Sequence, residues 1–300
     1  MRFAILTTAI IVPLSLLPER FFDPMNRVTA AMVGELLHLA GLPVVVNGAL
    51  IGVQAFTARV IGECLALQPM GLYAAFILAF PGRPRGKGLA LAGGLALLQV
   101  LNLLRIALVT LLGAHVPRLF DLAHIHLGQA AMIAAVLGLA LFWCRRRLPD
   151  QEVPPMASAF PARFLAYASL LFLAWVPLNR PYMGLLDATL QRLFALAGYT
   201  LILPRGLALY FQTFGLVTFA ALVLAMRGIP PLRKCRFLIS GLLLLTLFQL
   251  CFRLCNVWLT AFQIGWLAPI AQVTYNLCVY ALPVIAATVL LTRGRLAKAE

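Results

Sequence analysis

Apolar runs of about 20 residues recur from one end of this chain to the other, and they restrict what it can fold into. Each run is long enough to cross a hydrocarbon core of about 30 Å. Of the 300 residues, 63% are apolar and only 11% are charged, too few polar side chains to cover a soluble domain. The sequence therefore predicts an all-α polytopic membrane protein and excludes a soluble enzyme with a single membrane anchor.

Eight stretches qualify as transmembrane helices by length and hydropathy. They lie at about residues 3–18, 64–81, 88–113, 124–143, 162–179, 209–226, 237–258 and 268–292. The first is not a typical signal peptide, because it lacks a basic region beyond Arg2 and a small-x-small cleavage site. We therefore expect eight transmembrane helices, beginning with this first one.

The chain has a net charge of +15, and its basic residues lie mainly in the connections between these stretches. Apart from Arg105 and Arg253, fifteen of the Lys and Arg residues are assigned to one side of the membrane and seven to the other. Basic residues are retained on the cytoplasmic side, so both termini are expected in the cytoplasm of a cell (inner or plasma) membrane. The same placement argues against a nucleic-acid partner and for contact with membrane lipid.

Two segments on the outer side are long, roughly 19–63 and 180–208. In the first, an amphipathic stretch with Val28, Met32, Leu36 and Leu39 on one face predicts a short helix on the membrane surface. The β-branched residues around Asn47-Gly48 then predict a small hairpin.

The second outer segment repeats this layout. Leu186, Leu190 and Leu193 mark one face of a helix that is expected to end at Ala197-Gly198, and a turn follows at 204–206. The repetition indicates two four-helix halves in the same orientation, residues 1–150 and 151–300, descended from a duplication. The second half offers no equivalent of Cys64 and no histidine, so it is expected to be non-catalytic.

Three chemically reactive side chains are expected at one membrane level. Cys64 opens the second span, Arg105 lies in the outer part of the third, and His124 opens the fourth. Ionisable groups within spans are costly, which makes each a functional candidate. Each also has an ordinary interpretation: a packing cysteine, an arginine that reaches the interface, and an interfacial histidine. Their convergence favours function.

Acyl transfer is the chemistry that these three groups support. A thiolate attacks a peptide carbonyl, a histidine moves the protons, and an arginine stabilises the oxyanion. A cysteine at a helix N-terminus near a cation has its thiolate favoured, although the adjacent Glu63 opposes this effect.

The Asn-x-x-Arg-Ile motif at 102–106, with a cysteine opening the preceding helix and a histidine about twenty residues later, resembles the exosortase/archaeosortase family. The resemblance covers about residues 25–147. It implies a cysteine transpeptidase or protease that cleaves the C-terminal sorting signal, such as a PEP-CTERM signal, of an exported protein partner at the outer face of the membrane. By it, Cys64 is the nucleophile, Arg105 the oxyanion stabiliser and His124 the acid/base.

Two neighbouring histidines are less suitable than His124. Phe120-Asp121 and Gln129 around His124 look like the family's third motif, whereas His126 points about 200° away on a helix and His115 lies in the outer loop. Asn102 lies one turn from Arg105 and is expected to orient its guanidinium, or else to bond a neighbouring helix.

Two other functions stay open. Duplicated halves are a known transporter plan, in which Arg105 and Arg253 would hold an anionic substrate. An inactive relative acting as an assembly partner is the third reading, because Leu65-Ala66 follow the cysteine where many members have a small or polar pair. The six cysteines include no CxxC pair and suggest neither disulfides nor a metal site, and no cofactor is expected.

Overall fold

The computed structural model describes residues 2–80, 83–120, 122–147, 160–203, 213–277 and 281–285. The chain forms two compact units, Met1–Pro161 and Ala162–Glu300, each described here by itself. The expected boundary between residues 150 and 151 falls outside the described residues.

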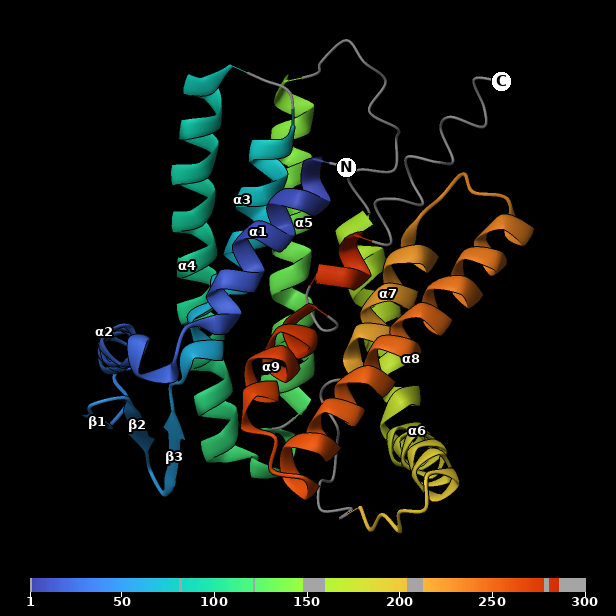
Figure 1. Ribbon diagram of the computed structural model, residues 1–300. Coiled ribbons are helices and arrows are strands. Elements are labelled where there is room, and N and C mark those ends of the chain that lie inside the picture. The colour runs from blue at the N-terminus through green and yellow to red at the C-terminus, as the bar shows by residue number, and fades with distance from the viewer. Residues whose placement is uncertain are drawn as a thin grey trace. The chain divides into compact units, whose positions relative to one another are not determined.

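The first unit is built around a group of packed helices. Its elements are α1 (Arg2–Leu16), the short turn η1 (Glu19–Phe21), α2 (Asp23–Leu39), η2 (Gly62–Leu65), α3 (Leu67–Ala79), α4 (Pro84–His115), η3 (Pro117–Leu119), the π-helical turn η4 (Leu122–Leu127) and α5 (Gly128–Arg147). Helix α3 packs against α1, α4 and α5 (Figure 1). Pro84 is the first residue of α4. A backbone N–H at this position has no partner within the helix, so proline costs no hydrogen bond there.

A small antiparallel sheet lies beside α2 and α4 in this unit. Its strands β1 (Val44–Asn47), β2 (Leu50–Val53) and β3 (Phe56–Arg59) pair in that order. The hairpin that Asn47-Gly48 predicts is confirmed: Asn47 pairs with Leu50, and Gly48 has the positive φ of +61° that the two-residue turn requires. The third strand was not predicted.

Helix α2 runs across the other helices of this unit and is seen end-on in Figure 1. Its buried face consists of residues such as Ala30, Val33 and Leu37, which pack inward. Val28 and Met32 of the predicted apolar face are exposed, 60% and 46%, as is expected of a helix that presents this face to lipid.

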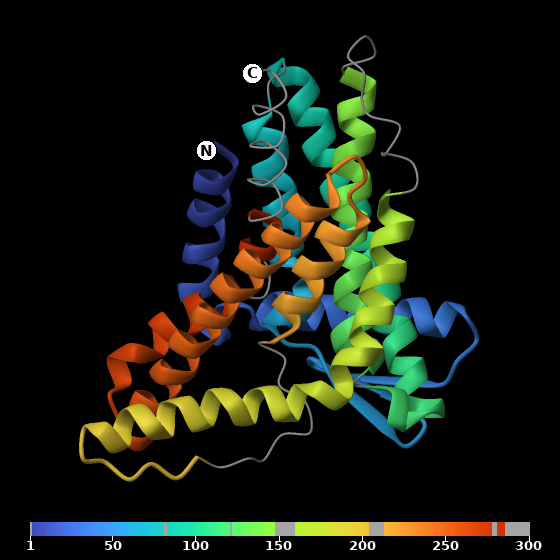
Figure 2. The ribbon, with the colours of Figure 1, turned by 90° about the vertical axis from the view of Figure 1, so that its right-hand side faces the viewer.

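The second unit contains α6 (Phe160–Leu196), α7 (Phe214–Ala225), α8 (Pro231–Ala261), η6 (Gly265–Leu267) and α9 (Ala268–Asn276). The prediction of a membrane helix ending near 179 and a separate outer helix was wrong. Helix α6 continues through Pro177 and Pro181, and Figure 2 shows that it bends partway along its length. Proline removes one backbone bond and kinks a helix, yet membrane helices accommodate it. Residues 200–203 form no strand, and the predicted turn at 204–206 lies outside the described residues.

The helices agree with an all-helical membrane protein. In the described residues α4, α6 and α8 are long and apolar enough to cross a membrane, and α1, α3, α5 and α7 are shorter apolar helices. Seven of the eight expected spans thus coincide with an apolar helix, but the thirteen residues of α3 reach only about 20 Å. The eighth span begins with the nine-residue helix α9, and its residues 278–280 and 286–292 lie outside the described residues, so eight crossings stay a prediction.

Candidate active site

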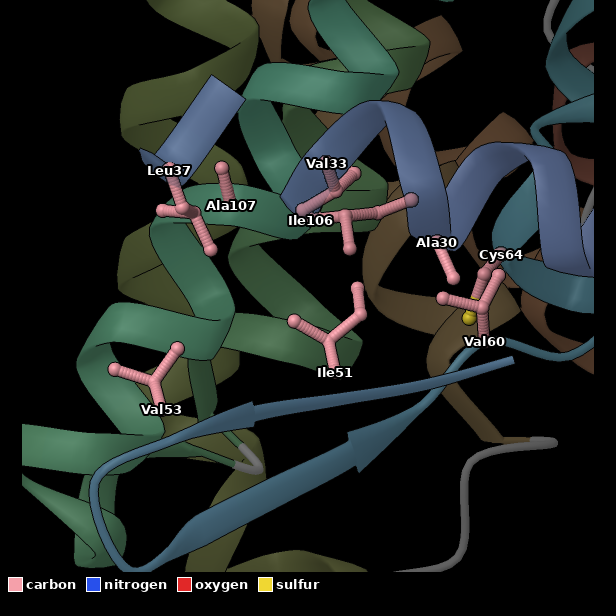
Figure 3. Close-up of a cluster of buried hydrophobic side chains, with 9 residues drawn as sticks. All are labelled: Ala30, Val33, Leu37, Ile51, Val53, Val60, Cys64, Ile106 and Ala107. Carbon is pink, nitrogen blue, oxygen red and sulfur yellow. The ribbon is translucent and has the colours of Figure 1, made fainter. Parts of the chain in front are cut away.

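Cys64 lies at one end of a buried apolar cluster (Figure 3). The cluster combines α2, the sheet and α4, and its buried members are Ala30, Val33, Leu37, Ile51, Val53, Val60, Cys64, Ile106 and Ala107. The sulfur points toward Ala30 and Val60 in the figure, and Cys64 is only 5% exposed. The thiol is therefore held in apolar surroundings beneath α2.

The backbone around Cys64 corrects one expectation. Cys64 does not open the membrane helix: it lies in η2, and α3 begins at Leu67. Ala66 separates the two with a left-handed φ of +55°, and the Cys64 N–H bonds the carbonyl of Ile61 at 2.8 Å. Because the chain turns at Ala66 before α3 starts, the thiol stands outside the apolar helices and the predicted helix-dipole effect does not apply at its position.

Asn102 joins Cys64 to Arg105. The Asn102 side chain is fully buried in α4, and its Nδ2 donates to the Cys64 carbonyl oxygen at 2.7 Å. Its Oδ1 accepts a hydrogen bond from Arg105 Nη1 at 3.3 Å. Asn102 thus makes both contacts that its position suggested, one to a neighbouring segment and one to the guanidinium a turn later.

Arg105 passes close to the first residue of α5. A Cβ built on Gly128 would lie 2.8 Å from Arg105 Nε, 3.1 Å from its Cδ and 3.2 Å from the Ala123 carbonyl oxygen. No side chain other than glycine's hydrogen fits there without displacing the arginine. Gly128 was missed by sequence reasoning, because nothing in a helical glycine's neighbours along the chain reveals a contact with another helix.

One donor of Arg105 stands out. Its Nε is buried and has no hydrogen-bond partner among the described residues. An unpaired buried donor costs about 1–3 kcal/mol, so such groups in native proteins call for an explanation, catalysis among them.

His124 is half-buried on η4, the turn that leads into Gly128. Its ring stacks on Phe120 with centroids 5.3 Å apart and an interplanar angle of 8°. Phe120 in turn contacts Phe56 of β3, the strand that leads toward Cys64. Cys64, Asn102 and Arg105 are therefore linked by hydrogen bonds, whereas His124 is positioned by its stacking on Phe120.

The remaining histidines of this region are not equivalent to His124. His115 is exposed at the end of α4, and its Nδ1 lies 2.9 Å from the carbonyl oxygen of Leu111, to which it donates within its own helix. The side chain of His126 lies outside the described residues.

Burial is the main influence on the thiol. It raises the pKa of Cys64, while a backbone hydrogen bond with Ile61 and the charge of Arg105 lower it, and Glu63 raises it slightly. The opposing effect of Glu63 agrees with the expectation from its position. With a raised pKa, the group at rest is a neutral thiol that needs a base to become a nucleophile.

The second unit holds a separate buried polar network. Arg253 Nε donates to Asp187 Oδ1 at 2.8 Å, and Asp187 is 1% exposed. Tyr182 donates to Gln249 Oε1 at 2.6 Å, linking the same two helices, α6 and α8. Sequence reasoning missed Asp187 and Gln249. Their spacing at one-turn intervals from the neighbouring polar residues was the signal that could have found them.

Among the described residues no group of three or more His, Cys, Asp or Glu side chains is placed to hold a metal ion. Cys64, Cys235, Cys251 and Cys255 are free thiols.

Comparison with known proteins identifies the first unit. The family model of the transmembrane exosortases matches residues 1–143, which contain Cys64, Asn102, Arg105 and His124. No curated protein and no solved structure matches the chain. The match over residues 1–143 supports the assignment of the chain to the transmembrane exosortase family.

Proposed function

We propose that this protein is a membrane-embedded cysteine transpeptidase or protease that cleaves the C-terminal sorting signal of exported proteins at the outer face of the cell membrane. The observation that carries the proposal is the chain of hydrogen bonds from the Cys64 carbonyl through Asn102 to Arg105. It supports a common site for a thiol and a guanidinium that are far apart in the sequence.

Cys64 is the proposed nucleophile. His124 takes the thiol proton, and the sulfur attacks the carbonyl carbon of the scissile peptide bond, forming an S–C bond and a tetrahedral oxyanion. His124 then gives the proton to the departing amine as the C–N bond breaks. The product is a thioester on Cys64 and a released C-terminal peptide that begins with a free amine.

Arg105 is the proposed oxyanion donor. Its Nη1 donates to Asn102, which fixes the orientation of the guanidinium. A preoriented donor of this kind stabilises charge that develops in the transition state, and losing one typically costs about 10²–10³-fold in rate. Water, an amine or a lipid group then resolves the thioester.

A transporter is less well supported. That hypothesis used Arg105 and Arg253 to bind an anionic substrate, but Arg253 is already neutralised by Asp187, and Arg105 is hydrogen-bonded to Asn102 beside a thiol. Arg253 is therefore not arranged as a vacant anion site, and the two-arginine site that this hypothesis needs is incomplete.

The test is processing of an exported reporter that ends in a short polar motif, an apolar helix and a basic tail, co-expressed with the protein. Cys64→Ala should abolish processing, and Cys251→Ala, an exposed thiol in the second unit, should leave it intact. Normal processing by Cys64→Ala would end the catalytic proposal and leave an assembly role.

A further inference from the structure

The outer edge of β3 presents unpaired backbone groups. Val60 N–H bonds the Ala49 carbonyl at 2.8 Å, so the residues of this strand that bond β2 are Val60, Ala58 and Phe56. In an antiparallel pair the bonded positions alternate. The N–H and C=O groups of Thr57 and Arg59 therefore point away from β2, toward the edge.

These outward groups are open. Thr57 and Arg59 are exposed, and within the described residues their backbone groups bond nothing. An exposed strand edge of this kind is a ready template for a further strand.

The edge leads directly to the nucleophile. After Arg59 the chain stays extended through Ile61, at φ −123° and ψ 170°, and then enters η2 with Cys64. At about 3.3 Å per residue, the strand direction covers roughly 10 Å between Arg59 and the start of this turn. A peptide of four to six residues lying along β3 would thus reach the turn that carries Cys64.

We propose that an extended segment of the exported substrate adds to β3 as a fourth strand, bonding the backbone groups of Thr57 and Arg59 and delivering the scissile bond to Cys64. Strand addition gives affinity through main-chain bonds, whatever the side chains. It also presents the peptide in an extended form, with the scissile carbonyl accessible. This inference rests on the proposed function and names how its substrate is held.

Proline at position 57 tests the edge. It removes the outward N–H and leaves the β2–β3 bonds intact, a placement that edge strands tolerate. Thr57→Pro should lower reporter processing about three- to ten-fold, the equivalent of one backbone hydrogen bond. Val46→Pro, the corresponding change at an outward position of β1, should keep processing near wild type. Arg59→Pro repeats the test at the second outward amide.

Photocrosslinking decides the outcome independently of catalysis. A photoreactive residue in place of Arg59, in a Cys64→Ala background, should capture the uncleaved reporter. The inference is overturned if the photoreactive residue captures only a second copy of this chain. It is also overturned if nothing is captured and both edge proline variants process the reporter as the wild type does. Failure of the proposed function looks different: the Cys64→Ala protein would then process the reporter.

Discussion

The side-chain amide of Asn102 donates a 2.7 Å hydrogen bond to the carbonyl oxygen of Cys64, 38 residues earlier in the chain. This bond fixes the turn that carries the thiol against α4. The other end of the same amide holds Arg105. One buried side chain thereby sets the distance between the proposed nucleophile and the proposed oxyanion donor.

Replacing Asn102 should lower reporter processing more than it lowers the stability of the fold. Asn102→Ala leaves the Cys64 carbonyl without its donor and Arg105 without its acceptor, at a cost of about 1–3 kcal/mol. We expect reporter processing to fall about 10–100-fold. Asn256→Ala is the control, because the Asn256 side chain donates to the Phe252 carbonyl one turn earlier in its own helix. Equal processing by the two variants would contradict the role given to Asn102.

Gly128→Ala should act through Arg105. The new Cβ would meet Nε at 2.8 Å and displace the guanidinium, so we expect processing to drop at least ten-fold with the protein still folded. Gly138→Ala, also in α5, is the matched control, since the nearest atom to its Cβ is Pro161 Cγ at 4.0 Å. Wild-type processing by Gly128→Ala would show that the contact with Arg105 is unimportant.

The pH dependence of Cys64 alkylation follows from the direction of its pKa shift. Burial raises the pKa, so alkylation by a small thiol reagent should increase with pH through a midpoint above that of an ordinary cysteine. Arg105 lowers the pKa, and Arg105→Gln should therefore move the midpoint to higher pH. Glu63 raises it, and Glu63→Gln should move the midpoint to lower pH. Shifts in the opposite directions would exclude these charges as neighbours of the sulfur.

Breaking the ion pair of the second unit should destabilise the protein. Asp187→Asn leaves Arg253 without its counter-charge in a largely buried position, and loss of one partner of a buried pair typically costs about 3–5 kcal/mol. Thermal unfolding in detergent should report the loss. The double variant Asp187→Leu/Arg253→Leu should recover most of the stability, because it leaves no unpaired charge. A double variant as unstable as the single one would argue that the pair does more than balance charge.

Short-range sequence patterns predicted the elements whose formation depends on residues close together in the chain. Apolar length located seven helices, and Asn47-Gly48 located the first hairpin, because a positive φ is needed there. Strand β3 was missed, since Phe56–Arg59 is only four residues long and has no strong apolar alternation. A helix boundary was predicted near residue 179, but α6 continues through Pro177 and Pro181.

The candidate site was only partly readable from the sequence. Its reactive residue types and the Asn102–Arg105 spacing could be recognised, since both follow from one helix. The bond from Asn102 to Cys64 and the fit of Gly128 against Arg105 could not, because they depend on how separate segments pack. Polar spacing could have pointed to Asp187, but its pairing with Arg253 depends on how two helices pack.

The acyl-enzyme itself offers the most direct test. When the purified protein is mixed with the reporter and quenched, mass spectrometry should find the reporter's N-terminal fragment linked to Cys64 as a thioester that hydroxylamine releases. Continued cleavage with the adduct on another residue, or with hydroxylamine releasing nothing, would contradict a Cys64 nucleophile.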